Sequence, residues 1–327
     1  MFERFESFEP FEPVRTVRWN MHRLGPGVLF LLIYMCAAQP AAQDPAPPVF
    51  SSRTDIVQLH VNVFDNHSDA VPALTKDNFL IFEDGRNQDI TFFSSEDVPV
   101  AVGLVIDNSS SMITKGRMVV AGGMAFADSS HPEDELFTVH FNEHVRFGLP
   151  REFPFTPSRP LVRSTLAALR PGGKTALHDA VVAALEHVEK ASHQKHVIIV
   201  LSDGDDNASR HELSEMYERA QRSDAIIYAV GVNDPRTGGD GQPSVLRRLA
   251  EIGGGLAYFP KSDQETIAAF TEIAGNIRRG YSIGYVPSNA ARDGAWRKVK
   301  VMVRAPGKRL SARCRDGYTA PGPTGTR

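Results

Sequence analysis

The chain has 327 residues, with 36 Lys+Arg against 39 Asp+Glu and a formal net charge of -3. Hydrophobic residues make up 42% and charged residues 23%, which excludes a wholly disordered chain, a collagen-like fibre and a protein with many membrane spans. The balanced charge argues against a general nucleic-acid binder, which is usually basic. Two cysteines are too few for a four-cysteine zinc site or a disulfide-rich scaffold.

The N-terminal region has the features of a targeting segment. Met21 is followed directly by His22 and Arg23, and then by an apolar run, Val28–Ala38. This run is too short to span a membrane and has the length of a signal-peptide core. We expect residues 1–43 to hold a disordered start and a signal peptide (Met21–Ala42). The protein is then exported to the periplasm, the cell surface or the medium, and an uncleaved membrane anchor is the alternative.

A small β region follows a linker rich in Pro and Ala. Residues Asp55–Phe64 alternate between apolar and polar, which predicts a half-buried strand. Phe79–Glu83 and Asp89–Phe93 predict two more strands, and Asp84-Gly85 between them predicts a hairpin. We assign these strands to an N-terminal β flank over residues 44–97.

The pattern changes at Pro99, where apolar runs typical of strands buried on both faces begin to alternate with helical patterns. The predicted strands are Val100–Ile106, Leu136–Phe141, Val197–Leu201 and Ala225–Val232. The predicted helices are Arg117–Asp128, Leu161–Leu169, Leu177–Lys190, His211–Arg222, Ser244–Glu251 and Gln264–Arg278. Glu143–Leu149 follows its predecessor too closely for a crossover and is expected to be an antiparallel edge strand. The alternation predicts one doubly wound α/β domain with a mainly parallel sheet over residues 98–276.

Strand-like alternation returns after Gly280, over Tyr281–Val286, Arg297–Arg304 and Arg309–Arg313. Neither flank alone is large enough to bury a core comfortably. We therefore expect the flanks at residues 44–97 and 277–319 to form one small β-sandwich, with the α/β domain inserted between them. Residues 320–327 are expected to be a disordered tail.

Polar residues gather where the predicted strands end, which is where open α/β sheets bind ligands. Asp107-Asn108-Ser109-Ser110-Ser111 follows the first buried strand, Thr175 precedes the third helix, and Asp203 follows the strand Val197–Leu201. Together they offer two carboxylates and small hydroxyls, an all-oxygen set that suits a hard cation, Mg²⁺ first. Because hydroxyls are neutral, the ion remains a strong Lewis acid with room for another anionic ligand.

These residues resemble the metal-ion-dependent adhesion site of von Willebrand factor type A (VWA) domains. The resemblance implies a six-stranded, Rossmann-like sheet that binds Mg²⁺ or Mn²⁺. It implies direct or near-direct ligation by Ser109, Ser111 and Thr175, with Asp107 and Asp203 acting mainly through bound waters. A Glu or Asp of a partner protein would fill the open metal position. The flanks, with Phe82-Glu83-Asp84-Gly85 and Tyr281-Ser282-Ile283-Gly284-Tyr285, also resemble a bacterial group of VWA-related proteins that is mostly predicted to be exported.

We interpret the chain as an exported adhesion or interaction protein, not an enzyme, that captures an acidic residue of a protein partner through its metal. Nucleotide binding is not expected. Gly173-Lys174-Thr175 resembles the end of a P-loop, but Ala168 stands where its first Gly is required. Two alternatives stay open. One is an envelope assembly scaffold with a structural metal, and the other is a metal-dependent hydrolase, for which His178 and Asp179 are the nearest but unconvincing bases.

Overall fold

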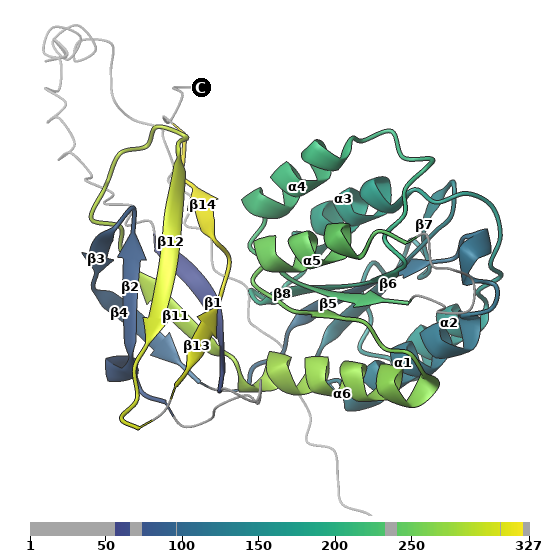
Figure 1. Cartoon of the computed structure of the whole chain (residues 1–327), viewed down its shortest axis with the longest axis horizontal. Helices are drawn as coiled ribbons and strands as arrows, with labels where there is room; N and C mark the ends of the chain where they lie inside the picture. The colour runs from purple at the N-terminus through teal and green to yellow at the C-terminus, as the bar shows by residue number, and fades with distance from the viewer. Residues whose placement is uncertain (1–55, 66–73, 96, 233–240, 308, 323–327) are drawn as a thin grey trace, which may run out of the picture. The chain divides into compact units, whose positions relative to one another are not determined.

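The computed structural model describes residues 56–65, 74–95, 97–232, 241–307 and 309–322 (Figure 1). The start and the signal peptide expected over residues 1–43 lie outside these ranges. All described residues belong to one structural unit, Arg53–Arg327. Within the described ranges, no helix combines the length and the apolar character needed to cross a membrane.

A six-stranded sheet with the order β10-β9-β8-β5-β6-β7 carries the candidate site. Its strands are β5 (Ala101–Asp107), β6 (Glu135–Phe141), β7 (Val145–Phe147), β8 (His196–Ser202), β9 (Ile226–Gly231) and β10 (Ala257–Tyr258). All neighbours are parallel except β7, which runs antiparallel to β6 at the edge. The predicted doubly wound, mainly parallel sheet is confirmed. The residue pattern did not indicate β10, because two residues carry no periodicity.

Helices cover both faces of this sheet (Figure 1). They are α1 (Gly116–Ser129), α2 (Arg159–Ala167), α3 (Leu177–Val188), α4 (Leu213–Arg222), α5 (Pro243–Ile252) and α6 (Asp263–Arg279). On one face α1, α2 and α6 bury side chains such as Phe126, Leu166 and Phe270. On the other face, α3, α4 and α5 pack against the strand side chains that point to that side, such as Val105, Val139 and Val200. Every residue of β5 is buried, which explains its continuous apolar sequence.

The two flanks form a β-sandwich, as predicted. Its sheets have the orders β13-β1-β11-β4 and β14-β12-β2-β3, and every strand pair is antiparallel. The strands are β1 (Val57–Phe64), β2 (Phe79–Glu83), β3 (Arg86–Gln88), β4 (Ile90–Ser94), β11 (Tyr281–Tyr285), β12 (Trp296–Val303), β13 (Ser311–Arg313) and β14 (Gly317–Thr319). Each sheet mixes strands from both flanks around a shared core that includes Leu59, Ile81, Ile283 and Val299. Neither flank therefore completes a sheet without the other.

Two details of the sandwich differ from the sequence-based expectation. The Asp84-Gly85 turn, with φ of 47° and 82°, joins β2 to β3 instead of to the strand predicted over Asp89–Phe93. That strand becomes β4 and pairs with β11 in the opposite sheet, because the chain crosses between sheets after Gln88. The predicted tail also starts too early: Ala320 is buried, and its amide donates to the Ala295 carbonyl at 2.9 Å.

Candidate metal centre

Three loops meet at the carboxyl edge of the six-stranded sheet. The first follows β5 and leads into a 3-10 turn, η2 (Ser110–Met112), the second precedes α3, and the third follows β8. Strands β5 and β8 are parallel neighbours in register, with Ile106 opposite Leu201. Their following loops therefore leave the sheet at the same edge, which brings the predicted site residues of the first and third loops together.

The first loop places Ser109 and Ser111 side by side. Their Oγ atoms lie 3.0 Å apart. The amide of Ser109 donates to Asp107 Oδ1 at 2.9 Å, an Asx turn that fixes the start of the loop. Asp107 and Ser109 are buried, whereas Ser111 is exposed. The pair of hydroxyls thus extends from the buried carboxylate toward solvent.

Ser202, the last residue of β8, holds the carboxylate of Asp107 in place. Its Oγ donates to Asp107 Oδ2 at 2.7 Å and accepts the Gly204 amide at 3.0 Å. Burial raises the pKa of Asp107 to about 6, against the opposing effect of the hydrogen bonds from Ser109 and Ser202. Ser202 was not among the predicted site residues, although a polar residue directly after the apolar run Val197–Leu201 was a usable signal.

Asp203, in the third loop, has a cationic partner that was not predicted from the sequence. Its Oδ2 lies 3.3 Å from Nζ of Lys115, the residue before α1. Both side chains are nearly inaccessible, at 10% exposed for Lys115 and 5% for Asp203. The two residues are 88 positions apart in the chain, so no local pattern in the sequence indicated the pair.

Thr175 is fastened between the other two loops by main-chain hydrogen bonds. Its amide donates to Asn207 Oδ1 at 2.9 Å, and its carbonyl accepts the Asn207 and Ala208 amides, each at 2.9 Å. On the other side, the Gly173 carbonyl accepts the Ser110 amide at 3.1 Å. Gly173 has φ of 87°, and a Cβ there would lie 1.8 Å from a carboxylate oxygen of Glu143, so glycine is required. The second loop therefore bridges the first and the third.

The donor chemistry fits a hard divalent cation. The five predicted residues supply two carboxylates and three hydroxyls, all oxygen, as Mg²⁺ and Mn²⁺ prefer. Among the described residues, no group of three or more His, Cys, Asp or Glu side chains could hold a metal ion instead. The candidate site differs from such a cluster because three of its five side chains are hydroxyls. Lys115 is the group that does not belong to a cation-binding set.

His178 and Asp179 have structural roles. They lie in the first turn of α3, as predicted. Asp179 accepts the amides of Arg210 and His211 at 3.1 and 3.0 Å, and the amide of His178 donates to Asp206 Oδ2 at 3.0 Å. Burial would raise the pKa of Asp179, but the hydrogen bonds from His211 and Arg210 outweigh it and lower the pKa. These residues hold the third loop to the helix.

Residues 102–273, more than half of the chain, match the model of the von Willebrand factor type A domain. The chain belongs to the VWA family. VWA domains often mediate protein–protein interaction or adhesion and are mostly not enzymes. They can bind a divalent metal at a metal-ion-dependent adhesion site.

Solved structures share this VWA fold at low sequence identity. A von Willebrand factor type A protein from Catenulispora acidiphila is 14% identical, with a TM-score of 0.50 over 83% of this chain and 76% of that chain. The vWF domain of the pilus tip protein Mfa5 from Porphyromonas gingivalis is 15% identical, with a TM-score of 0.46 over 55% and 95%. Proximal thread matrix protein 1 from the mussel byssus, with zinc in its metal-ion-dependent adhesion site (MIDAS) motif, is 16% identical. Its TM-score is 0.47 over 60% of this chain and 49% of that chain. No curated protein matches the chain.

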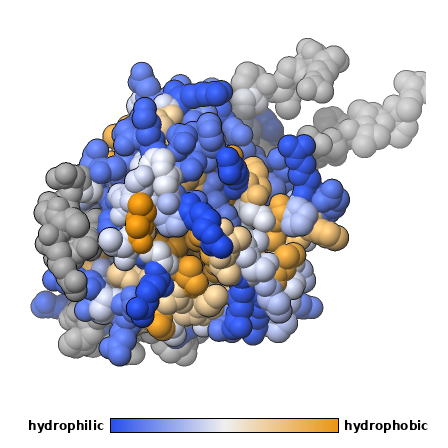
Figure 2. Space-filling view, turned by 90° about the vertical axis from the view of Figure 1, so that its right-hand side faces the viewer, coloured by the Kyte–Doolittle hydropathy of each residue, from blue (hydrophilic) through white to orange (hydrophobic). Residues whose placement is uncertain are grey.

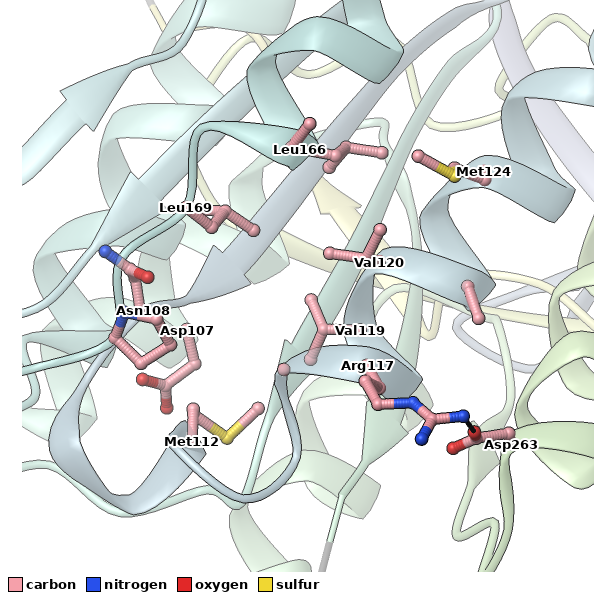
Figure 3. A pocket seen from close by; sticks show the side chains of 14 residues that line it. Asp107, Asn108, Met112, Arg117, Val119, Val120, Met124, Leu166, Leu169 and Asp263 are labelled. Carbon is pink, nitrogen blue, oxygen red and sulfur yellow. Dashed lines mark hydrogen bonds and ion pairs between the residues drawn. The ribbon is translucent and has the colours of Figure 1, made fainter.

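The VWA domain also has an apolar groove of about 500 Å³ beside the first loop of the candidate metal centre (Figure 3). Val119 and Met124 of α1 line one side, and Leu166 of α2 lines the other. Asp107 and Asn108 lie at one end of the groove. On the face shown in Figure 2, hydrophobic residues are likewise recessed between hydrophilic side chains. The candidate metal centre thus has apolar surface beside it, in addition to the charged side chains of Asp107, Asp203 and Lys115.

Proposed function

We propose that this VWA protein is exported and binds a protein partner through a divalent cation, Mg²⁺ or Mn²⁺. Ser109, Ser111 and Thr175 act as the direct or near-direct ligands, and Asp107 and Asp203 act mainly through bound waters. An acidic side chain of the partner takes the remaining coordination position. The observation that carries this proposal is the meeting of the three loops at one sheet edge, where hydrogen bonds join the first loop to the second and the second to the third.

The chain's own residues prepare this site in the absence of a partner. Ser202 orients the carboxylate of Asp107, and Asn207 fixes the main chain of Thr175. A bound cation supplies the positive charge that attracts a carboxylate in a partly desolvated contact. The hydroxyl ligands add no negative charge of their own, and Lys115 offsets one of the two carboxylates, so the occupied site keeps a positive charge that favours an anionic partner group.

Export and the division of the chain are part of the same proposal and rest on the sequence. We divide the chain into a signal peptide at Met21–Ala42, a VWA domain at residues 98–276, and flanks at residues 44–97 and 277–319. N-terminal sequencing of the mature protein tests the signal peptide. A first residue near position 43 supports cleavage, and an intact N-terminus contradicts it.

Affinity capture from an envelope extract of the host cell tests the binding function. The protein is immobilised in the presence of Mg²⁺, and the extract is loaded and washed. Bound proteins are then eluted with EDTA. Ser109→Ala should lose the captured partner, because it removes a direct ligand. Ser110→Ala is the matched control, since it changes the same loop without touching a predicted ligand, and it should capture normally.

Capture that persists undiminished in EDTA would contradict the metal bridge. If the protein instead assembles into a larger complex both with and without metal, the scaffold interpretation is favoured. Circular dichroism of Ser109→Ala distinguishes a lost ligand from a lost fold.

A further inference from the structure

Lys115 places a buried ammonium group beside the candidate metal centre. Its Nζ contacts Asp203 Oδ2 at 3.3 Å. Its main chain is fixed at the start of α1, where the Lys115 amide donates to the Met112 carbonyl at 3.0 Å and its carbonyl accepts the Val119 amide at 3.2 Å. The ammonium is therefore held by the same segment that carries Ser109 and Ser111.

The buried charges of the site do not balance a divalent ion. Asp107 and Asp203 supply two negative charges, and Lys115 supplies one positive charge. A divalent cation would neutralise the carboxylates by itself, so with Lys115 present the occupied site carries an excess positive charge. Because these groups lie in a poorly solvated environment, like charges there repel more strongly than in water.

We propose that Lys115 competes with the divalent cation for Asp203. In the metal-free protein the ammonium neutralises this buried carboxylate, and in the presence of metal it lowers the affinity of the site. This inference rests on the proposed metal site. Lys115 acts through Asp203. Removing its charge should therefore raise the affinity for the cation, whereas removing a ligand should lower it.

Lys115→Met tests the competition, because methionine keeps much of the length of lysine and removes the charge. Isothermal titration with Mn²⁺ should give about tenfold tighter binding than for the wild-type protein, since the repulsion is gone. Lys115→Arg keeps the charge and should stay close to the wild-type affinity. Arg117→Met is the matched control: it removes a cation two positions along whose side chain is 92% exposed, and it should leave the affinity unchanged.

Thermal unfolding gives a second readout. In EDTA, Lys115→Met leaves Asp203 buried without its counter-charge, so its Tm should fall below that of the wild type. Added Mn²⁺ should then raise the Tm of Lys115→Met by more than it raises that of the wild type. If Lys115→Met does not fold in EDTA, Lys115→Gln replaces it, because its amide still donates to Asp203 without carrying a charge.

The outcomes separate this inference from the proposed function. If the wild type binds Mn²⁺ and Lys115→Met and Lys115→Gln bind it equally or more weakly, the competition is wrong and the metal site stands. If none of these proteins binds Mn²⁺, the metal site and the inference both fail. Tighter binding that Ser109→Ala abolishes in the Lys115→Met background supports both.

Discussion

The two ends of the six-stranded sheet both bury acidic side chains, but they surround them differently. At the amino end, Asp134 is fully buried, accepts the amides of Val100 and His131 at 2.9 and 2.8 Å, and receives Arg278 on both oxygens at 3.1 and 2.9 Å. At the carboxyl end, Asp107 is held by Ser109 and Ser202.

This difference separates a structural carboxylate from one that is available to a ligand. A carboxylate has about four acceptor positions, and the donors around Asp134 fill them. Ser109 and Ser202 use only part of the capacity of Asp107, and small hydroxyls lie beside it in place of a guanidinium. Asp107 therefore has spare acceptor capacity for waters or a cation, whereas Asp134 fastens β6 to α6.

The largest expected effect comes from breaking the amino-end network. Asp134→Ala should lower the free energy of unfolding by about 3–5 kcal/mol, because it leaves Arg278 and two amides without their shared acceptor. Urea denaturation followed by circular dichroism measures this loss. A loss below about 1 kcal/mol would remove the contrast between the two ends.

Histidines near the two ends should respond to acid in opposite directions. His140, near the end of β6, has its pKa lowered to about 4 by burial. The unfolded chain therefore takes up the proton first, and the contribution of His140 to stability is lost as the pH falls from about 6.5 toward 4. At His196, the first residue of β8, burial lowers the pKa, but the hydrogen bond to Asp224 at 2.8 Å outweighs it and raises the pKa. Its contribution is present below about 6.5 and is lost as the pH rises through its folded pKa.

Urea denaturation at pH 7, 6 and 5 checks this opposition. Relative to the wild type, His140→Asn should lose less stability on acidification, by about 1–2 kcal/mol. His196→Asn should lose more. Equal pH profiles for the two variants would show that the environments at the two ends do not differ in this way.

Much of the fold was predictable because it rests on local periodicity. β5 and β8 could be predicted because strands buried on both faces are apolar throughout. Since parallel strands end at the same sheet edge, the loops with Asp107 and Asp203 could then be placed together. The contacts that refine the site were not predictable. Lys115 reaches Asp203 across 88 residues, and Ser202 reaches Asp107 across 95, so tertiary packing alone creates both contacts. The crossing from β3 to β4 was missed for the same reason, since sheet assignment after Gln88 depends on distant β11.

A smaller effect on stability is expected at the carboxyl end. In EDTA, Asp107→Asn should change the free energy of unfolding by less than about 1 kcal/mol or increase it, because it removes a charge whose burial is unfavourable. It should also lose the rise in Tm that Mn²⁺ gives the wild type. Asp134→Asn serves as the paired variant, and a similar large loss for both would mean that Asp107 is as structural as Asp134.

Titration with Mn²⁺ shows directly whether an all-oxygen site at the three loops binds a divalent cation. Electron paramagnetic resonance of Mn²⁺ during titration counts bound ions and reports oxygen ligation. We expect one Mn²⁺ per chain in the wild type and in Ser110→Ala, and strongly reduced binding in Ser109→Ala and Thr175→Ala. Absence of stoichiometric binding, or binding that both ligand variants retain, would contradict a metal site at these loops.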